Sequence, residues 1–234
     1  MTGHGASGGR PAALTQADWL FDLDDTLYGV ASGINDHVRA RGDAYLARLL
    51  NLPDDLAEAE RERRIGQAMA GHISTLDAVR ALDGSDGTAD RFYDYRYEAM
   101  SYDALAADAA LAGALAGLSG RRIVFTNARA DHAAEVLKRL AISHAFEAVY
   151  DIYDGGLVHK PDGRAYGAIV ARFGLDPAQT VMVEDRADNL QPAKALGMTT
   201  VWIAHGRPLP GWAAAHVDHV VDGDLATWLS GPGG

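Results

Sequence analysis

The stretch Trp19-Leu20-Phe21-Asp22-Leu23-Asp24-Asp25-Thr26 places three carboxylates directly after a short apolar run. Like charges this close repel one another, so the carboxyl groups are expected to have raised pKa values and to cost stability unless a cation binds there. A buried strand that ends in Asp-x-Asp is typical of metal-assisted attack on phosphorus, with one carboxylate as nucleophile and the other as acid and base. The alternative is a solvated acidic turn, because Asp is common in turns.

Four further apolar runs follow along the chain, and helix-like segments separate them. They are Arg122–Phe125, Ala148–Ile152, Val181–Val183 and Thr200–Ile203, in addition to Trp19–Leu23. Helical patterns at Ala130–Leu140 and Tyr166–Phe173, the second closed by Gly174 as a C-cap, lie between them. Strands that alternate with helices predict an α/β fold with a doubly wound parallel sheet.

Residues 32–102, between the first two runs, have almost no strand pattern and are rich in Ala, Arg, Glu and Leu. The spacing of apolar residues predicts helices at Ile34–Leu49, Leu56–Met69, Ile73–Leu82 and Asp90–Met100. We therefore expect a helical cap at 32–102, a catalytic core made of 17–31 and 103–234, and a flexible tail at 1–16. Because open α/β sheets bind ligands at the carboxyl ends of their strands, an insertion after the first strand is expected to act as a lid.

The composition narrows the classes of partner. The 234-residue chain has a formal net charge of −11, 48% hydrophobic residues and no cysteine. The negative charge argues against a nucleic acid polymer, whereas a small anionic substrate is compatible if a metal and local cations reverse the field. Without cysteine, neither disulfides nor a Cys-based zinc site can form. No secretory signal or membrane-spanning stretch is evident, so we expect no membrane partner and a cytoplasmic location, while the oligomeric state is not predicted.

Polar groups follow the later apolar runs as well. Thr126-Asn127 offers a hydroxyl, an amide and backbone N–H groups for phosphate oxygens, although the same pair can serve as a plain helix N-cap. Lys160 is one of three lysines in the chain. Its compact ammonium can neutralise a phosphate and a carboxylate in a crowded site, although a solvated loop lysine is the plainer alternative. Glu184-Asp185 provides hard oxygen ligands that suit Mg²⁺.

Two further polar residues, Asp188 and Asn189, follow this acidic pair. We expect Asp188 to cap the next helix rather than to bind metal, because Pro192 is placed where a first helical turn would begin. Whether Asp188 or Asn189 takes part in the metal site stays open at this stage.

The ordered set Phe21–Tyr28, Thr126-Asn127, Lys160-Pro161 and Glu184-Asp185 resembles the haloacid dehalogenase superfamily, specifically its phosphatase branch. The resemblance covers nearly everything from Asp18 to Gly206. It implies a Rossmann-like core with a cap and a phosphomonoester hydrolase that forms an aspartyl-phosphate. The dehalogenase branch lacks a second aspartate two residues after the nucleophile, so Asp24 favours phosphoryl transfer.

The resemblance also implies a role for each site residue. Asp22 would be the nucleophile and Asp24 the general acid and base. The phosphate-binding residues would be Thr126, Asn127 and Lys160. The ligands of the Mg²⁺ cofactor would be Asp22, Asp24 through its backbone carbonyl, Glu184 and Asp185.

Within the superfamily, the segments 24–28, 125–128 and 184–189 look like those of the pyrimidine 5′-nucleotidase group. Arg186 is a difference, because that group more often has Asp-Asp-Ser at the acidic motif. The main expectation is a nucleotidase that acts on pyrimidine nucleoside monophosphates. The alternative is a phosphatase or phosphomutase of a small sugar phosphate or phosphoglycolate-like metabolite, although no cap group suited to a mutase's second transfer is evident. A non-catalytic binding protein of this fold is disfavoured, because it would be free to lose the costly buried acids.

The cap carries an aromatic and basic segment, Arg91–Tyr97, that could stack on a nucleobase. Packing inside the helical cap is the favoured alternative, since Phe92 and Tyr95 lie near one helical face. Tyr28 is likewise expected to have a structural part.

Overall fold

The computed structural model describes residues 9–14 and 16–231, and the rest of the predicted tail lies outside these ranges. The chain forms two compact units, one made of Gly33–Ser101 and the other of the segments before and after it. The described part of the predicted tail is packed on the larger unit: Leu14 is buried, and the Arg10 backbone N–H donates to the carbonyl of Trp228 at 2.8 Å. No helix among the described residues is long and apolar enough to cross a membrane.

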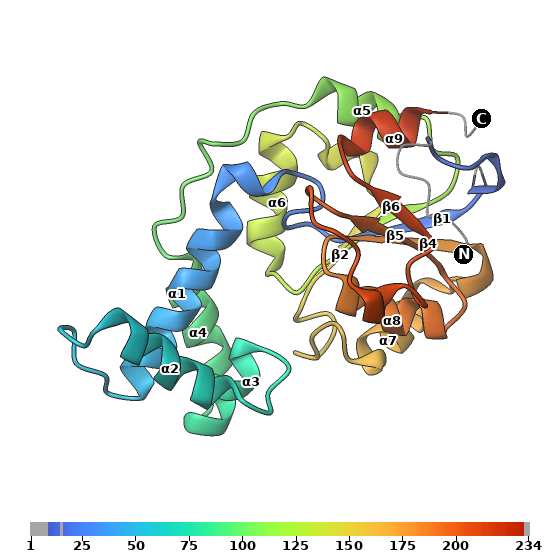
Figure 1. Cartoon of the computed structure of the whole chain (residues 1–234). Helices are drawn as coiled ribbons and strands as arrows, with labels where there is room; N and C mark the ends of the chain where they lie inside the picture. Colours follow the sequence, from blue (N-terminus) through green and yellow to red (C-terminus); the bar gives the residue numbers. More distant parts are fainter. Residues whose placement is uncertain (1–8, 15, 232–234) are drawn as a thin grey trace. The chain divides into compact units, whose positions relative to one another are not determined.

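The larger unit is built on a six-stranded parallel sheet with the strand order β3-β2-β1-β4-β5-β6 (Figure 1). The strands are β1 (Asp18–Phe21), β2 (Arg122–Phe125), β3 (Ala148–Tyr150), β4 (Thr180–Glu184), β5 (Thr199–Ile203) and β6 (His219–Val221). This arrangement confirms the predicted α/β fold with a doubly wound parallel sheet. Since β1 lies between β2 and β4, and Phe21 pairs with Val124 and Val183, the residues that follow these three strands emerge at one edge.

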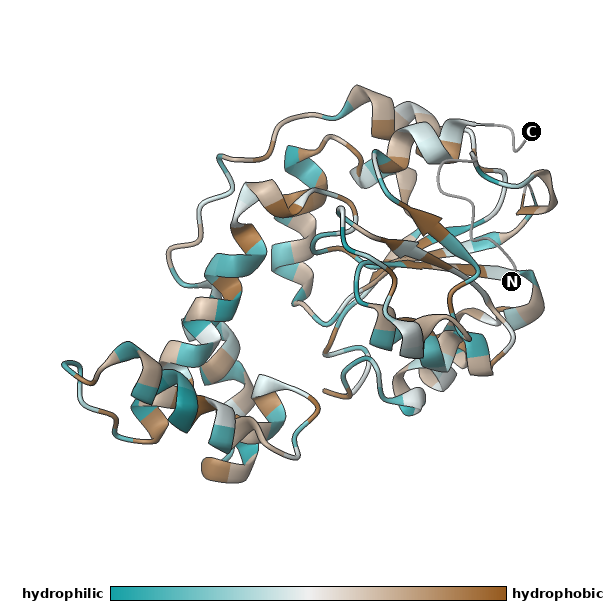
Figure 2. Cartoon of the chain, in the orientation of Figure 1, coloured by the Kyte–Doolittle hydropathy of each residue, from teal (hydrophilic) through white to brown (hydrophobic). Residues whose placement is uncertain are grey.

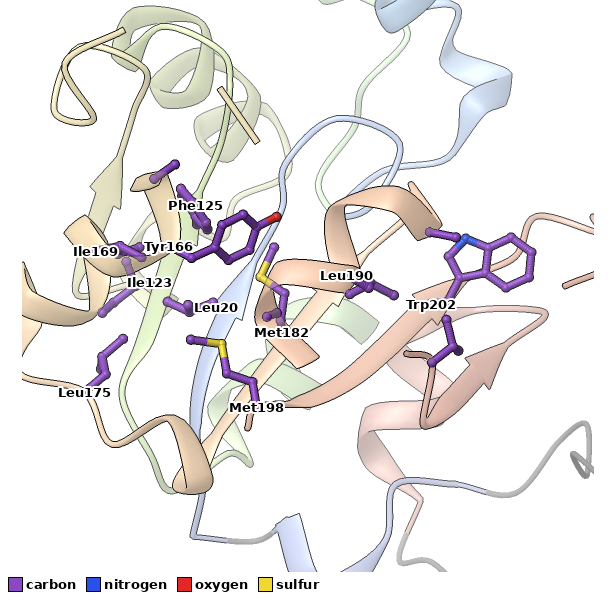
Figure 3. Packing of buried hydrophobic residues seen from close by; sticks show 14 of the residues in the cluster. Leu20, Ile123, Phe125, Tyr166, Ile169, Leu175, Met182, Leu190, Met198 and Trp202 are labelled. Carbon is purple, nitrogen blue, oxygen red and sulfur yellow. The ribbon is translucent and has the colours of Figure 1, made fainter. Parts of the chain in front are cut away.

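Helices cover both faces of this sheet (Figure 1). One face carries α7 (Gly163–Phe173) and α8 (Ala187–Ala195), and the other carries α5 (Ala109–Ala116), α6 (Ala130–Arg139) and α9 (Leu225–Ser230). Figure 3 shows the core under α7 and α8, where Tyr166 and Leu190 pack against Leu20 and Met182 of the central strands. Each such fully buried side chain stabilises the fold by about 1.5–3 kcal/mol. The predicted C-cap is also present, since Gly174 has a left-handed φ of 60° after α7.

The start of α8 differs from the prediction. The helix begins at Ala187, with Arg186 as its N-cap residue, so Pro192 lies inside the helix and Asp188 lies in the first turn instead of capping it. The chain enters the helix almost directly after β4, because the Asn189 side-chain amide donates to Glu184 Oε2 at 3.0 Å and holds the first turn against the strand end.

The second unit is a bundle of four helices, α1 (Ile34–Leu49), α2 (Glu58–Met69), α3 (Thr75–Leu82) and α4 (Thr88–Tyr97). Hydrophobic and hydrophilic residues are interleaved along these helices, as amphipathic packing requires (Figure 2). Leu46 and Leu76 are fully buried in the bundle. The bundle follows β1 in the sequence, as predicted, and its position over the strand ends stays a prediction.

The aromatic segment of α4 packs inside this bundle. Phe92 and Tyr93 are fully buried, and the ring of Tyr45 meets Phe92 edge-on with 5.5 Å between centroids. The guanidinium of Arg41 lies 3.8 Å from the ring centroid of Tyr95 and donates to the Tyr95 carbonyl at 2.7 Å. Phe92 and Tyr93, the two most buried members of the segment 91–97, therefore pack inside the helical bundle instead of facing a ligand.

Candidate active site

Three buried carboxylates meet at the carboxyl ends of β1 and β4. Asp22, Glu184 and Asp185 can each present an oxygen within 4.8 Å of the other two. Asp22 is fixed from both sides, because its backbone N–H donates to the Val183 carbonyl at 2.9 Å and its Oδ2 accepts from the Thr26 hydroxyl at 3.2 Å. The pairing of β1 with β4 in the sheet thus brings the two predicted acidic motifs into one cluster.

Lys160, from the loop that follows β3, is buried inside this cluster. Its Nζ donates to Asp22 Oδ1 at 2.7 Å, to Glu184 Oε2 at 2.8 Å and to the Phe125 carbonyl at 2.8 Å. Burial is the largest single influence and lowers the pKa of Lys160, but the two carboxylates together outweigh it and raise the pKa above its ordinary value. The ammonium therefore stays charged and uses all three of its donors inside the protein.

Asn127 fixes the loop that carries Lys160. Its amide nitrogen donates to the Lys160 carbonyl at 3.1 Å, and its amide oxygen accepts from the Lys160 backbone N–H at 2.8 Å. Beside it, the buried Thr126 hydroxyl oxygen accepts from the Ala128 backbone N–H at 3.0 Å. Phosphate binding by Thr126, Asn127 and Lys160 stays a prediction, and the Asn127 side chain has a second, positioning part that the sequence did not indicate.

Two aspartates of the cluster have raised pKa values. Burial, with the nearby charge of Glu184, raises the pKa of Asp22 to about 7, even though Lys160 acts in the opposite direction. Burial and the charges of Glu184 and Asp22 raise the pKa of Asp185 to about 10. Both carboxyl groups therefore hold protons at pH values where an exposed aspartate is ionised.

The donor set fits a divalent cation such as Mg²⁺. When all are ionised, the three carboxylates and the buried ammonium of Lys160 sum to two negative charges. The half-exposed Arg207, whose Nη2 lies 3.6 Å from Asp185 Oδ2, offsets part of this charge, and a divalent ion would neutralise the rest. Hard carboxylate oxygens are the ligands that Mg²⁺ prefers. Glu184 is the most engaged of the three, since Oε2 accepts from Lys160 and Asn189 and Oε1 accepts from the Arg186 backbone N–H at 3.1 Å. Asn189 also holds a buried oxygen, Oδ1, with no hydrogen-bond partner among the described residues.

Asp24 lies outside this carboxylate set and is held by residues that the sequence did not single out together. Its Oδ1 lies 2.8 Å from Nε2 of His132, and the same oxygen accepts a hydrogen bond from the Tyr28 hydroxyl. The next residue, Asp25, has a left-handed φ of 58°, and its carbonyl lies 2.6 Å from Nε2 of His205. Aspartate tolerates this conformation better than most residues, and it lets the chain turn sharply after the acidic motif.

Comparison with known proteins identifies the family of this fold, in which Asp22 directly follows the central strand β1. The chain belongs to the haloacid dehalogenase-like hydrolase family, which it matches over residues 20–197. The chain is 29% identical to a phosphoglycolate phosphatase of Rhodospirillum rubrum over 230 residues, covering 91% of this chain and 90% of that protein. The protein is thus a hydrolase of this family.

Solved structures show the same fold. A haloacid dehalogenase-type phosphatase of Thermococcus onnurineus matches with a TM-score of 0.59 and 21% identity, over 94% of this chain and all of that one. A candidate β-phosphoglucomutase of Thermotoga maritima matches with a TM-score of 0.52 and 19% identity, over 88% of this chain and 94% of that one. At these identities the likeness shows the fold alone.

Proposed function

We propose that this protein is a Mg²⁺-dependent phosphatase of a small sugar phosphate or phosphoglycolate-like metabolite and that Asp22 becomes transiently phosphorylated. The observation that carries the proposal is the contrast between two aspartates of one turn. Asp22 is paired with Lys160 inside the buried carboxylate cluster, whereas Asp24 is held separately through His132 and Tyr28. This contrast supports the proposal that Asp22 is the nucleophile and Asp24 the acid and base.

The residues divide the reaction between them. An oxygen of Asp22 attacks phosphorus while Lys160 neutralises charge beside it, and Asp24 donates a proton to the leaving alkoxide. The ionised Asp24 then takes a proton from the water that hydrolyses the aspartyl-phosphate. In this proposal the hydroxyl of Thr126, directly after β2, holds a phosphate oxygen.

The divalent ion would be held by Asp22, Asp185 and the backbone carbonyl of Asp24, with Glu184 as a further carboxylate of the cluster. When bound, it supplies charge neutralisation that lets an anionic phosphate approach a carboxylate. In this arrangement Glu184 also anchors Lys160 and α8, because both of its oxygens accept hydrogen bonds.

Two observations favour a small metabolite over a pyrimidine nucleotide. The relative from Rhodospirillum rubrum, a phosphoglycolate phosphatase, aligns over 91% of this chain. In the helical bundle, Phe92 and Tyr93 are fully buried, so neither ring is available to stack on a base. Arg91 is engaged at the loop before α4, where it donates to Asp83 Oδ2 at 2.9 Å.

A panel of phosphate esters tests this proposal. The purified protein is assayed with 2-phosphoglycolate, glucose 1-phosphate, UMP and CMP, each with Mg²⁺ and with EDTA, by release of inorganic phosphate. We expect the highest kcat/KM for one of the first two substrates and loss of activity in EDTA. Higher values for UMP and CMP support the nucleotidase instead. Absence of turnover with every ester supports a binding protein and overturns the proposal.

A further inference from the structure

A chain of hydrogen bonds runs from Tyr102 through His132 to Asp24. His132 lies in the first turn of α6 and is 1% exposed. Its Nε2 lies 2.8 Å from Asp24 Oδ1, and its Nδ1 lies 2.9 Å from the Tyr102 hydroxyl oxygen. All three residues belong to the same compact unit. The mechanism described so far uses only the last of them.

The direction of each hydrogen bond depends on the tautomer of His132. Burial, with the nearby charges of Asp131 and Asp24, raises the pKa of Tyr102 to about 12, so its hydroxyl keeps its proton at neutral pH. When this hydroxyl donates to Nδ1, the neutral imidazole carries its proton on Nε2. Nε2–H then donates to Asp24 Oδ1, so Tyr102 selects the tautomer of His132 that can hold the carboxyl group.

Tyr28 donates to the same oxygen of Asp24. A carboxyl oxygen has two lone pairs, and the hydrogen bonds from His132 and Tyr28 occupy both lone pairs of Oδ1. A proton carried by Asp24 is therefore directed to its other oxygen, Oδ2.

We propose that Tyr102, His132 and Tyr28 are positioning residues that hold Oδ1 of Asp24 and thereby assign proton transfer to Oδ2. The inference rests on the proposed function, in which Asp24 is the general acid and base. As the Asp22–phosphorus bond forms and the bond from phosphorus to the leaving oxygen breaks, the Oδ2 proton moves to that oxygen. In the second step Oδ2 takes a proton from water as the water oxygen bonds to phosphorus and the Asp22–phosphorus bond breaks.

Substrates with different leaving groups distinguish a positioning role of these residues from a purely structural role. An alkyl phosphate such as 2-phosphoglycolate expels a poor alkoxide that needs a proton, whereas p-nitrophenyl phosphate expels a stable phenolate that does not. General acid catalysis contributes about 10²–10⁴-fold where a proton is needed. A defect in the placement of Asp24 therefore reduces kcat/KM for the alkyl ester selectively, while a defect in folding, metal binding or phosphate binding reduces both values together.

The experiment compares His132→Leu with His132→Gln, because the glutamine amide can still donate from near the Nε2 position. We expect His132→Leu to lower kcat/KM for 2-phosphoglycolate by about 10²-fold and that for p-nitrophenyl phosphate far less, with His132→Gln recovering about tenfold of the loss. Tyr102→Phe should give a smaller loss of the same selectivity, and it decides the question if the His132 variants do not fold. His216→Leu, which removes another buried imidazole, should leave the ratio of the two substrates unchanged.

Asp24→Asn, assayed in parallel, separates failure of this inference from failure of the proposed function. If Asp24→Asn loses the alkyl ester selectively but the His132 and Tyr102 variants lower both substrates equally, or neither, the positioning proposal is overturned alone. If Asp24→Asn itself shows no selectivity, Asp24 is not the general acid and both proposals fail. Equal loss in His132→Leu and His132→Gln on both substrates also overturns the positioning part.

Discussion

The ammonium of Lys160 lies 2.7 Å from Oδ1 of Asp22, and both groups are buried. The same ammonium lies 2.8 Å from Glu184, so one cation compensates two buried carboxylates at the carboxyl ends of β1 and β4. A buried ion pair adds little stability relative to an apolar replacement of both partners, but loss of one partner leaves an uncompensated charge. Loss of Lys160 is therefore expected to cost more stability than loss of Lys138 or Lys194, whose ion pairs are exposed.

Lys160→Met is expected to lower the free energy of unfolding by about 3–5 kcal/mol, because it leaves two buried carboxylates without their cation. Urea unfolding in EDTA measures the change. The double variant Lys160→Met, Glu184→Gln removes one of the stranded charges, so it should recover part of the loss. An unfolding free energy of Lys160→Met equal to that of the unmodified protein contradicts the interpretation.

The metal-free protein should lose stability as the pH rises. Unfolded aspartates have a pKa of about 4, whereas the folded values are about 7 for Asp22 and about 10 for Asp185. Below about pH 4 both states are protonated, and above it the unfolded chain releases protons that the folded chain retains, so the unfolded state gains stability. This loss extends to about pH 7 for Asp22 and to about pH 10 for Asp185.

Asp185→Asn tests this directly, because it removes the more strongly perturbed group. In EDTA near neutral pH the variant should be more stable than the unmodified protein by at least about 1 kcal/mol, which raises Tm by about 2–4 °C. The difference should vanish near pH 4. Added Mg²⁺ should raise the Tm of the unmodified protein and not that of the variant, since binding to the folded state alone is stabilising. If Mg²⁺ raises the Tm of the variant as much as it raises that of the unmodified protein, Asp185 is not a ligand.

Asn127→Leu is expected to destabilise the protein by about 1–3 kcal/mol, because the backbone N–H and carbonyl of Lys160 each lose their amide partner. The same change should lower kcat/KM, since Lys160 is then held less well beside Asp22. Thermal unfolding and phosphatase assays measure the two effects. Full stability and activity in Asn127→Leu contradict the positioning part of this side chain.

The parallel sheet and the polar motifs at its strand ends follow from patterns that the sequence displays locally. Buried parallel strands are nearly continuous apolar runs, so β1, β2 and β4 could be found together with the polar residues at their ends. Strand β6 was missed, because it is three residues long and two of them, His219 and Val220, are only partly buried. The sequence prediction placed the start of the helix near Pro192, whereas α8 begins at Ala187. The hydrogen bond from Asn189 to Glu184, which holds the first turn of α8 against the end of β4, could not be read from the local pattern.

The hydrogen bonds around Asp24 could not be predicted for a similar reason. His132 is 108 residues from Asp24 in the sequence and meets it only because α6 follows the strand next to β1. Its helix shows an ordinary amphipathic pattern, in which a buried histidine carries no chemical signal. Tyr28, expected to be structural, contacts the same aspartate, and only the tertiary structure shows that the two donors share one oxygen.

The central claim is that Asp22 accepts the phosphoryl group, and chemical trapping of the aspartyl-phosphate tests it most directly. The protein is mixed with substrate and Mg²⁺, quenched with borohydride, which reduces an acyl phosphate to an alcohol, and digested for mass spectrometry. We predict conversion of position 22, and of no other aspartate, to homoserine, with none in Asp22→Asn. Turnover by Asp22→Asn, or reduction at a different aspartate during turnover, contradicts the account.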